Sequence, residues 1–236
     1  MTSDPHPREN PGDGGPDPLA IRDCAMTAMA TGEEALTLRE LRERLRDLPP
    51  ACLYYHFWAR LLRPVYRLRE FNNDFANWAA FKLRDQVLAE RLALVDPADH
   101  PDTGSLKTEL LELVEERVEE DDGHGTQAAD EAFHFLRAEL VVFDTHRRIR
   151  EPAELTDLCS TLTPGSVFYH FVDARQRNPD GADDFQRWLR GFGDHYDGLC
   201  RRLQQVDVHF STLEDLREEL HEHFCLVEQP EEAARV

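Results

Sequence analysis

Two histidines in closely similar aromatic surroundings are the residues of this 236-residue chain best suited to chemistry. His56 lies in the stretch LYYHF, and His170 lies in VFYHF. An imidazole can exchange a proton near neutral pH, so each ring is a candidate for proton transfer or ligand binding. We favour a structural role, in which each ring is partly buried and ties its helix to a carbonyl or to the region of Asp74 or Asp184.

Arginines accompany both histidines. On a helix, His56, Arg60 and Arg63 share one face at i, i+4 and i+7, opposite a face of aromatic and aliphatic residues. The second histidine has a similar polar stripe, and guanidinium groups can hold a carboxylate or a phosphate through paired hydrogen bonds. We assign no catalytic residue. The candidate ligand-binding residues in these two segments are His56, Arg60, Arg63, His170, Asp173, Arg175 and Arg177.

Other chemical motifs are weak or absent. His221 and Cys225 have the i, i+4 spacing of two metal ligands, but two ligands do not make a site. The sequence contains no GxxxxGK[ST], GxSxG, HExxH or GxGxxG motif. We therefore expect no metal site and no cofactor.

The two histidine segments belong to a longer internal similarity. The letters YHF recur at an offset of 114 residues, and DF-x-x-W recurs at an offset of 110 residues. The matches keep the same order in both copies, which predicts a tandem duplication. We expect a mainly α protein of two duplicated helical halves related by a pseudo-twofold axis, with room for a short β segment at the start of each half.

The elements that position the histidines can be predicted in outline. Ile21, Cys24 and Ala28 have helical spacing in the first copy, whereas LVVF in the second copy could be a strand. Thr37 and Glu40 form a capping box for the next helix, and the helices that carry the DF-x-x-W motif begin at the aspartates. The predicted division is a disordered leader at 1–19, a first helical repeat at 20–120, a linker at 121–131, a second helical repeat at 132–226 and a tail at 227–236.

The combination of FYHF, a short spacer and DF-x-x-W resembles a prokaryotic family of unknown function, DUF5752. The resemblance runs from about Ile21 to Phe224, once in each half, although the first half has a longer, arginine-rich spacer. The family implies no established activity. Its members are similar to proteins found near sugar-handling enzymes.

Composition restricts the partners. The 47 acidic and 27 basic residues give a formal net charge of −20, which disfavours nucleic acid and anionic membrane surfaces. No apolar run approaches the roughly 18 residues of a membrane span, and the first residues do not resemble a signal peptide. The five cysteines include no CxxC pair, so we expect a cytoplasmic protein.

Two functions are compatible with these observations. The first, which we favour, is a non-enzymatic interaction or regulatory module that binds a protein partner or a small anionic metabolite between its halves. The second is an enzyme that uses the histidines and arginines on an anionic, sugar-derived substrate. Whether the two rings converge on an open cavity or are hydrogen-bonded inside separate cores distinguishes the two functions.

Overall fold

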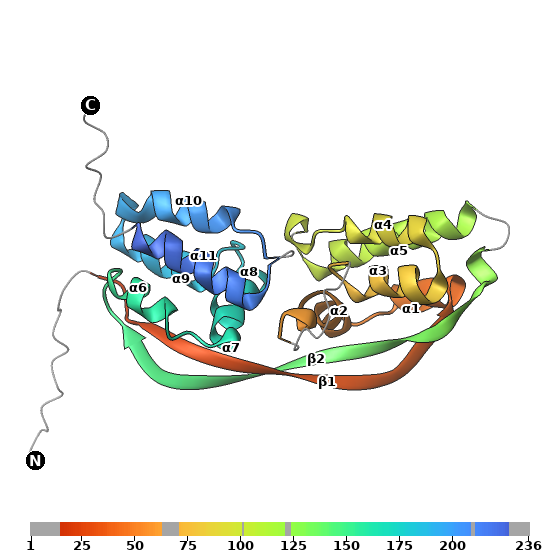
Figure 1. Cartoon of the computed structure of the whole chain (residues 1–236), viewed down its shortest axis with the longest axis horizontal. Helices are drawn as coiled ribbons and strands as arrows, with labels where there is room; N and C mark the ends of the chain where they lie inside the picture. Colours follow the sequence, from red (N-terminus) through yellow and green to blue (C-terminus); the bar gives the residue numbers. More distant parts are fainter. Residues whose placement is uncertain (1–14, 63–70, 101, 121–123, 209–210, 227–236) are drawn as a thin grey trace, which may run out of the picture.

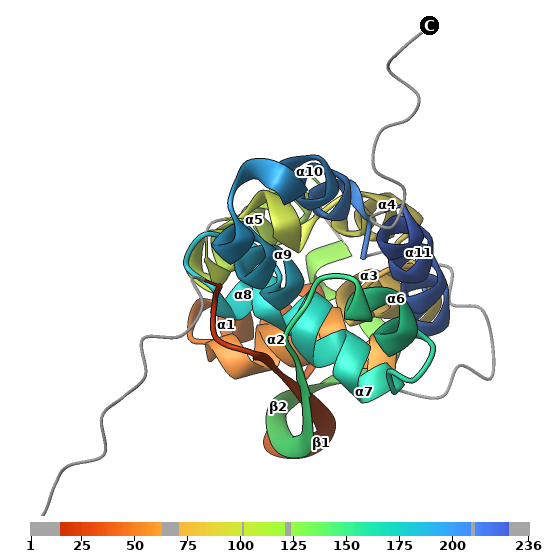
Figure 2. The ribbon, with the colours of Figure 1, turned by 90° about the vertical axis from the view of Figure 1, so that its left-hand side faces the viewer.

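The structure is a computed structural model that describes residues 15–62, 71–100, 102–120, 124–208 and 211–226. Two long strands, β1 (Leu19–Thr37) and β2 (Ala128–Ile149), form an antiparallel ribbon. Two groups of helices lie side by side along this ribbon (Figure 1). Seen along the long axis of the molecule, the ribbon lies against one side of the helices (Figure 2).

We call the two groups of helices the first and the second lobe. The first lobe consists of α1 (Leu38–Arg46), α2 (Pro50–Leu62), α3 (Asp74–Trp78), the π-helical turn Ala79–Leu83, α4 (Gln86–Ala93), α5 (Thr103–Glu119) and 3-10 turns at Pro97–Asp99 and His124–Thr126. The second lobe consists of α6 (Glu154–Cys159), α7 (Pro164–Val167), the π-helical turn Phe168–Asp173, α8 (Ala174–Arg177), α9 (Asp184–Leu189), α10 (Asp197–Gln205), α11 (Leu213–Cys225) and 3-10 turns at Arg190–Phe192 and Asp194–Tyr196.

Each strand begins beside one lobe and ends beside the other. The pairing runs from Leu19 opposite Ile149 to Thr37 opposite Ala128, with irregularities that include one between Ala30 and Glu34. The start of β1 therefore lies against the second lobe, and the start of β2 lies against the first (Figure 1). The ribbon is shared, because neither strand belongs to one lobe alone.

The prediction of a mainly α protein made of two duplicated helical halves is wrong. The two strands are 19 and 22 residues long, so the expected short β segment is instead the longest continuous element of the fold. The first lobe packs on β2, which comes just before the second lobe in the sequence. The second lobe packs on β1, which comes before the first lobe. The lobes are therefore not two self-contained halves of the chain.

The helical interpretation of the first apolar segment is also wrong. Ile21 and Cys24 are buried, but Ala28 of the same predicted face is exposed in the middle of β1. The partner of β1 is β2, which follows the whole first lobe, so no local pattern revealed the pairing. Small residues such as alanine do not discriminate well between a helix and a strand whose central part is largely exposed.

The predicted helix starts agree with the structure. Thr37 and Glu40 make both hydrogen bonds of the capping box at the start of α1. Asn73 and Asp183 cap α3 and α9 through hydrogen bonds from the backbone of Ala76 and Gln186. These bonds are local, which is why the sequence alone predicted them.

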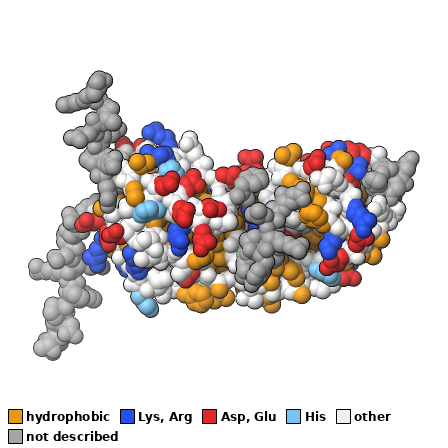
Figure 3. Space-filling model, viewed as in Figure 1, with side chains coloured by type: hydrophobic (Ala, Val, Ile, Leu, Met, Phe, Trp, Pro, Cys, Tyr) orange, Lys and Arg blue, Asp and Glu red, His pale blue; other side chains and the backbone are white. Residues whose placement is uncertain are grey.

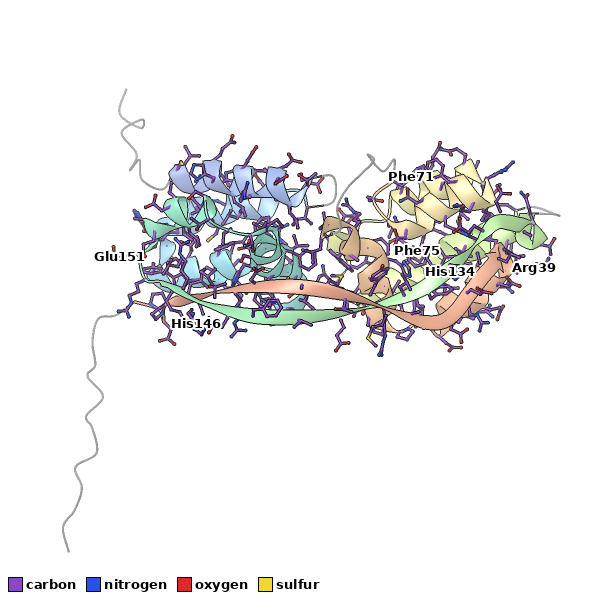
Figure 4. The ribbon with its side chains drawn as sticks, turned by 60° about the horizontal axis from the view of Figure 1, so that its bottom comes forward. Arg39, Phe71, Phe75, His134, His146 and Glu151 are labelled. Atoms are coloured by element: carbon purple, nitrogen blue, oxygen red, sulfur yellow. The ribbon has the colours of Figure 1, made fainter. Side chains whose placement is uncertain are left out.

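The first lobe and β2 share an aromatic core. Phe75 of α3 stacks on Phe133 of β2 with ring centroids 4.9 Å apart, and both side chains are buried. Phe75 and His134 are labelled in Figure 4, where His134 lies on β2 beside the first lobe and His146 lies towards its other end. None of the described helices has the length and apolar character that crossing a bilayer requires.

The contact between β1 and the second lobe leads to a prediction for Gly165. A Cβ atom at Gly165 would overlap the Asp23 carboxylate and the backbone oxygen of Cys24. We expect Gly165→Ala to lower the free energy of unfolding by about 1–3 kcal/mol in denaturant titrations. Gly198→Ala in α10 is the matched control, because its Cβ would meet only the end of the Arg202 side chain, 3.8 Å away. The control should be neutral or stabilising, and equal losses in both variants would contradict the predicted close approach.

Candidate functional site

The first repeated histidine connects three segments. His56 is on α2 and is 3% exposed. Its Nδ1 lies 3.0 Å from Oδ2 of Asp74 at the start of α3, and its Nε2 accepts a hydrogen bond of 3.2 Å from the backbone N–H of Leu136 on β2. The ring thus joins two helices of the first lobe to the ribbon.

The second histidine repeats this geometry with the other strand. His170 is 2% exposed, and its Nδ1 lies 2.8 Å from Oδ2 of Asp184 at the start of α9. Its Nε2 accepts a hydrogen bond of 2.8 Å from the backbone N–H of Arg22 on β1. Each lobe is therefore attached to a different strand through the same group.

The backbone partner determines the tautomer of both rings. A backbone N–H can only donate, so Nε2 of His56 and of His170 must be the unprotonated acceptor. The proton is then on Nδ1, which donates it to the aspartate. With both nitrogens engaged, neither ring has a free position for proton transfer.

The carboxylate that orients His170 belongs to a wider network. Oδ2 of Asp184 also receives a hydrogen bond of 2.8 Å from Arg177. Burial by itself would raise the pKa of Asp184, but the hydrogen bond from His170 and the nearby charges outweigh it and hold that pKa below its usual value. The aspartate thus stays ionised and can accept the Nδ1 proton of the imidazole.

The tryptophan of each DF-x-x-W motif adds a second connection to the ribbon side of the fold. The indole nitrogen of Trp78 donates to the backbone oxygen of Glu131, and that of Trp188 donates to the backbone oxygen of Asp17, over 2.8 Å and 3.0 Å. Both tryptophans are mostly buried. The recurring YHF and DF-x-x-W residues therefore anchor the helices to backbone groups.

A cleft of about 1110 Å³ lies between the two lobes, separate from both imidazoles. Its first-lobe wall includes Tyr54 and Trp58 of α2 and residues 98–103 except for 101. Its second-lobe wall includes most of residues 172–181, and its floor is formed by Leu140 and Val142 of β2. The space-filling view shows acidic side chains on the surfaces of both lobes (Figure 3).

Among the described residues, a hydrogen bond between Tyr54 and Asp173 crosses from one wall to the other. The Tyr54 hydroxyl of the first lobe donates to Oδ1 of Asp173 of the second lobe over 2.7 Å. Burial raises the pKa of the Tyr54 hydroxyl and also that of the Asp173 carboxyl. The bond connects the two lobes directly across the cleft.

Arg175 lines the cleft but is held by the protein itself. Its guanidinium donates to the backbone oxygens of Leu203 and Val206 over 2.6 Å and 3.0 Å and lies 4.3 Å from the centre of the Phe171 ring. Burial lowers its pKa. Arg175 thus satisfies the carbonyl end of α10, a role that leaves little of its hydrogen-bonding capacity for a ligand.

Arg177 is also engaged. It bridges the carboxylates of Asp173 and Asp184 and lies 4.2 Å from the centre of the Tyr169 ring. Its side chain remains 36% exposed at the cleft. The guanidinium charge is therefore compensated by two carboxylates before any ligand binds.

The candidate residues thus separate into groups. Asp173, Arg175 and Arg177 line the cleft, whereas His56 and His170 are buried inside the lobes. Two further candidates belong to the first half. Arg60 is partly buried on α2, and Arg63 lies outside the described residues.

The prediction that His56 lies on the polar face of its helix is wrong. The ring points towards β2, and the neighbouring Tyr55 is buried as well. Helix α2 is buried on more than one side, because the ribbon packs on it in addition to the other helices. The ribbon residues that contact it are distant in the sequence. An amphipathic pattern cannot reveal such a second contact.

Sequence reasoning missed Gln186, a cleft residue of α9. It is 2% exposed, and its side chain makes no hydrogen bond with any described residue. Nothing in the sequence singled out Gln186 as a binding residue. It stands three residues after the N-cap Asp183, a position where glutamine is common in a capping box. In the structure Asp183 accepts from the backbone of Gln186, and the amide lines the cleft instead.

The His221 and Cys225 pair does not develop into a metal centre. Nε2 of His221 lies 3.6 Å from Sγ of Cys225, and its Nδ1 lies 3.3 Å from the backbone oxygen of Thr156. Within the described part of the chain, no group of three or more histidine, cysteine or acidic side chains is arranged to hold a metal ion.

Fold and site together define a class of protein: two helical lobes on a shared two-stranded ribbon, with buried histidine–aspartate pairs and a cleft between the lobes. The chain belongs to the family of unknown function DUF5752, whose profile matches residues 16–225. It is also similar to the solved structure of OrfY from Thermoproteus tenax, with 25% sequence identity and a TM-score of 0.74. That likeness covers 92% of this chain and 98% of the other. A comparison with curated proteins gives no match.

The geometry of the two imidazoles predicts a loss of stability when either is removed. In His56→Phe or His170→Phe, a backbone N–H and a carboxylate lose their buried partner. We expect each variant to lose about 2–4 kcal/mol of unfolding free energy in chemical denaturation. His134→Phe is the control, because that histidine side chain is 61% exposed on β2. A loss in the control as large as in the buried positions would contradict the structural role.

The burial of Asp183 leads to a prediction of how the free energy of unfolding depends on pH. Its Oδ2 is buried with no hydrogen-bond partner among the described residues, and burial raises its pKa to about 7. The unfolded value is about 3.9, so between these values the folded chain keeps a proton that the unfolded chain has released. This group therefore lowers stability as the pH rises through that window, by about 1.4 kcal/mol per pH unit at most.

Asp183→Asn should remove this dependence, since asparagine retains the N-cap but cannot ionise. We expect the variant to be more stable than the parent at pH 8, with a smaller difference at pH 5, in denaturant titrations at both values. Asp102→Asn, at the exposed N-cap of α5, is the control. An unchanged slope in Asp183→Asn would show that this carboxyl is not protonated in the fold.

Proposed function

We propose that this protein is a non-enzymatic interaction module that holds a segment of a protein partner in the cleft between its lobes. The observation that carries this proposal is the cleft itself, which is lined by both lobes and the ribbon and has a volume of about 1110 Å³. Sites for small molecules usually have roughly 300–1,000 Å³. The cleft lies at the upper end of that range, so it has room for an extended segment of a larger molecule.

The positions of the repeated histidines support a role without turnover. Neither His56 nor His170 lines the cleft, and the two nitrogens of each ring are bonded inside a lobe. A substrate in the cleft would have no access to either imidazole. The rings are better suited to maintaining the shape of the walls than to exchanging protons with a ligand.

Small anionic metabolites are the weaker candidates for the cleft. Arg175 donates to two backbone oxygens, and Arg177 bridges two carboxylates. An anion would have to displace these partners before it could form paired hydrogen bonds. The same argument disfavours an enzyme that acts on an anionic substrate at these arginines.

The ribbon floor provides a matched test. Val142 lines the cleft and is 40% exposed, whereas its neighbour Val141 is 45% exposed and points to the opposite face of β2. We expect affinity capture with the full chain to retain a partner protein with the parent and with Val141→Arg. Val142→Arg should lose it, because the longer side chain enters the cleft. The captured proteins and bound small molecules are identified by mass spectrometry.

Two outcomes would reject this proposal. One is a set of captured proteins that is the same for both valine variants. The other is a bound small molecule, with no protein, that Val142→Arg alone removes. Thermal unfolding of both variants checks that each is folded.

A further inference from the structure

The charges of the cleft distinguish between possible segments of a partner. Four carboxylates line it, those of Asp99, Asp102, Asp173 and Asp180, against the two guanidiniums of Arg175 and Arg177. Arg177 is paired with Asp173 and Asp184, and Arg175 donates to two backbone oxygens. Asp99, Asp102 and Asp180 then remain against the charge of Arg175. The cleft therefore presents more negative than positive charge to a ligand.

The first-lobe wall carries the carboxylates that are most available. Asp99 is exposed, and its carboxylate makes no ion pair with any described residue. Asp102 caps α5, and the backbone hydrogen bond from Ser105 lowers its pKa, so it stays charged. His100 also lines the cleft, and its Nε2 lies 2.6 Å from Oε2 of Glu109.

The second-lobe wall adds two polar groups. Asp180 lies on the opposite side of the cleft and pairs with Arg190 over 2.7 Å, where both side chains are nearly half exposed. Gln186, a residue only 2% exposed, lines the cleft, and its side-chain amide makes no hydrogen bond with a described residue. The oxygen of this amide can accept a hydrogen bond from a ligand that carries N–H donors.

We infer that the cleft recognises a cationic side chain, a lysine or arginine on the bound segment of the partner protein. This inference rests on the proposed function and names the chemistry of its partner. An ammonium or guanidinium group between the two walls meets carboxylates from both lobes and donates to the Gln186 oxygen. The net charge of −20 would also attract a basic partner from a distance and speed its association.

The test titrates the full chain with three end-capped peptides, tri-lysine, tri-glutamine and tri-glutamate, by calorimetry at about 0.15 M salt. We expect tri-lysine alone to bind, and more weakly as salt is added. Asp99→Asn and Asp180→Asn should each weaken tri-lysine binding roughly two- to fivefold, the range for an exposed ion pair. Val142→Arg should weaken it further, because it brings a positive charge into the cleft.

Glu139→Gln is the matched control for general attraction to an acidic protein. Glu139 is exposed on β2 and, like Val141, alternates away from the cleft-lining residues. At this salt concentration a charge more than about 8 Å from the bound cation is largely screened, so the control should bind tri-lysine like the parent. An equal loss in Glu139→Gln and Asp99→Asn would overturn the inference, since it would indicate diffuse attraction.

Other outcomes separate this inference from the proposed function. Absence of tri-lysine binding overturns the cationic recognition. Binding of tri-glutamate or tri-glutamine that Val142→Arg abolishes and Val141→Arg preserves also overturns it, but retains the cleft as a peptide site. Binding of tri-lysine with the expected variant pattern, together with a capture experiment that yields no protein, overturns the proposed function and retains the cation site.

Discussion

The hydrogen bond from a strand backbone to a buried imidazole is the interaction on which the arrangement of this protein depends. Leu136 donates to His56 and Arg22 donates to His170, and in both cases an aspartate holds the other ring nitrogen. A two-stranded ribbon is marginal by itself, since it has no third strand and no hydrophobic core of its own. Attachment of each strand to a different lobe gives the ribbon its support and holds both lobes on it.

The shared ribbon has a consequence for the space between the lobes. Because β1 and β2 span both lobes, the distance between the lobes is maintained by strand length and by the contact of Tyr54 with Asp173. Side chains in the middle of the ribbon then form the floor of an open cleft instead of a core. The same pairs that brace the lobes keep both imidazoles away from that cleft, which is why the repeated histidines and the binding surface are different parts of the molecule.

Local patterns in the sequence predicted the helices well and the strands poorly. The Thr37 capping box and the helix start at Asp183 depend on bonds within a few residues, so the residue types were sufficient to predict them. The ribbon depends on pairing across the whole first lobe, and its exposed middle lacks the alternation of a half-buried strand. Gln186 was missed for a related reason, because its place in a helix start gave it an ordinary local role.

The sequence by itself determined which residues recur, that the histidines lie in helical segments and that the molecule is strongly acidic. It also indicated that the rings have structural partners near Asp74 and Asp184. Only the tertiary structure decided which strand each ring meets, the tautomer that follows, and the separation of the rings from the cleft. The reason is physical: capping and helix periodicity are short-range in the chain, whereas strand pairing and interlobe contacts join residues that only folding brings together.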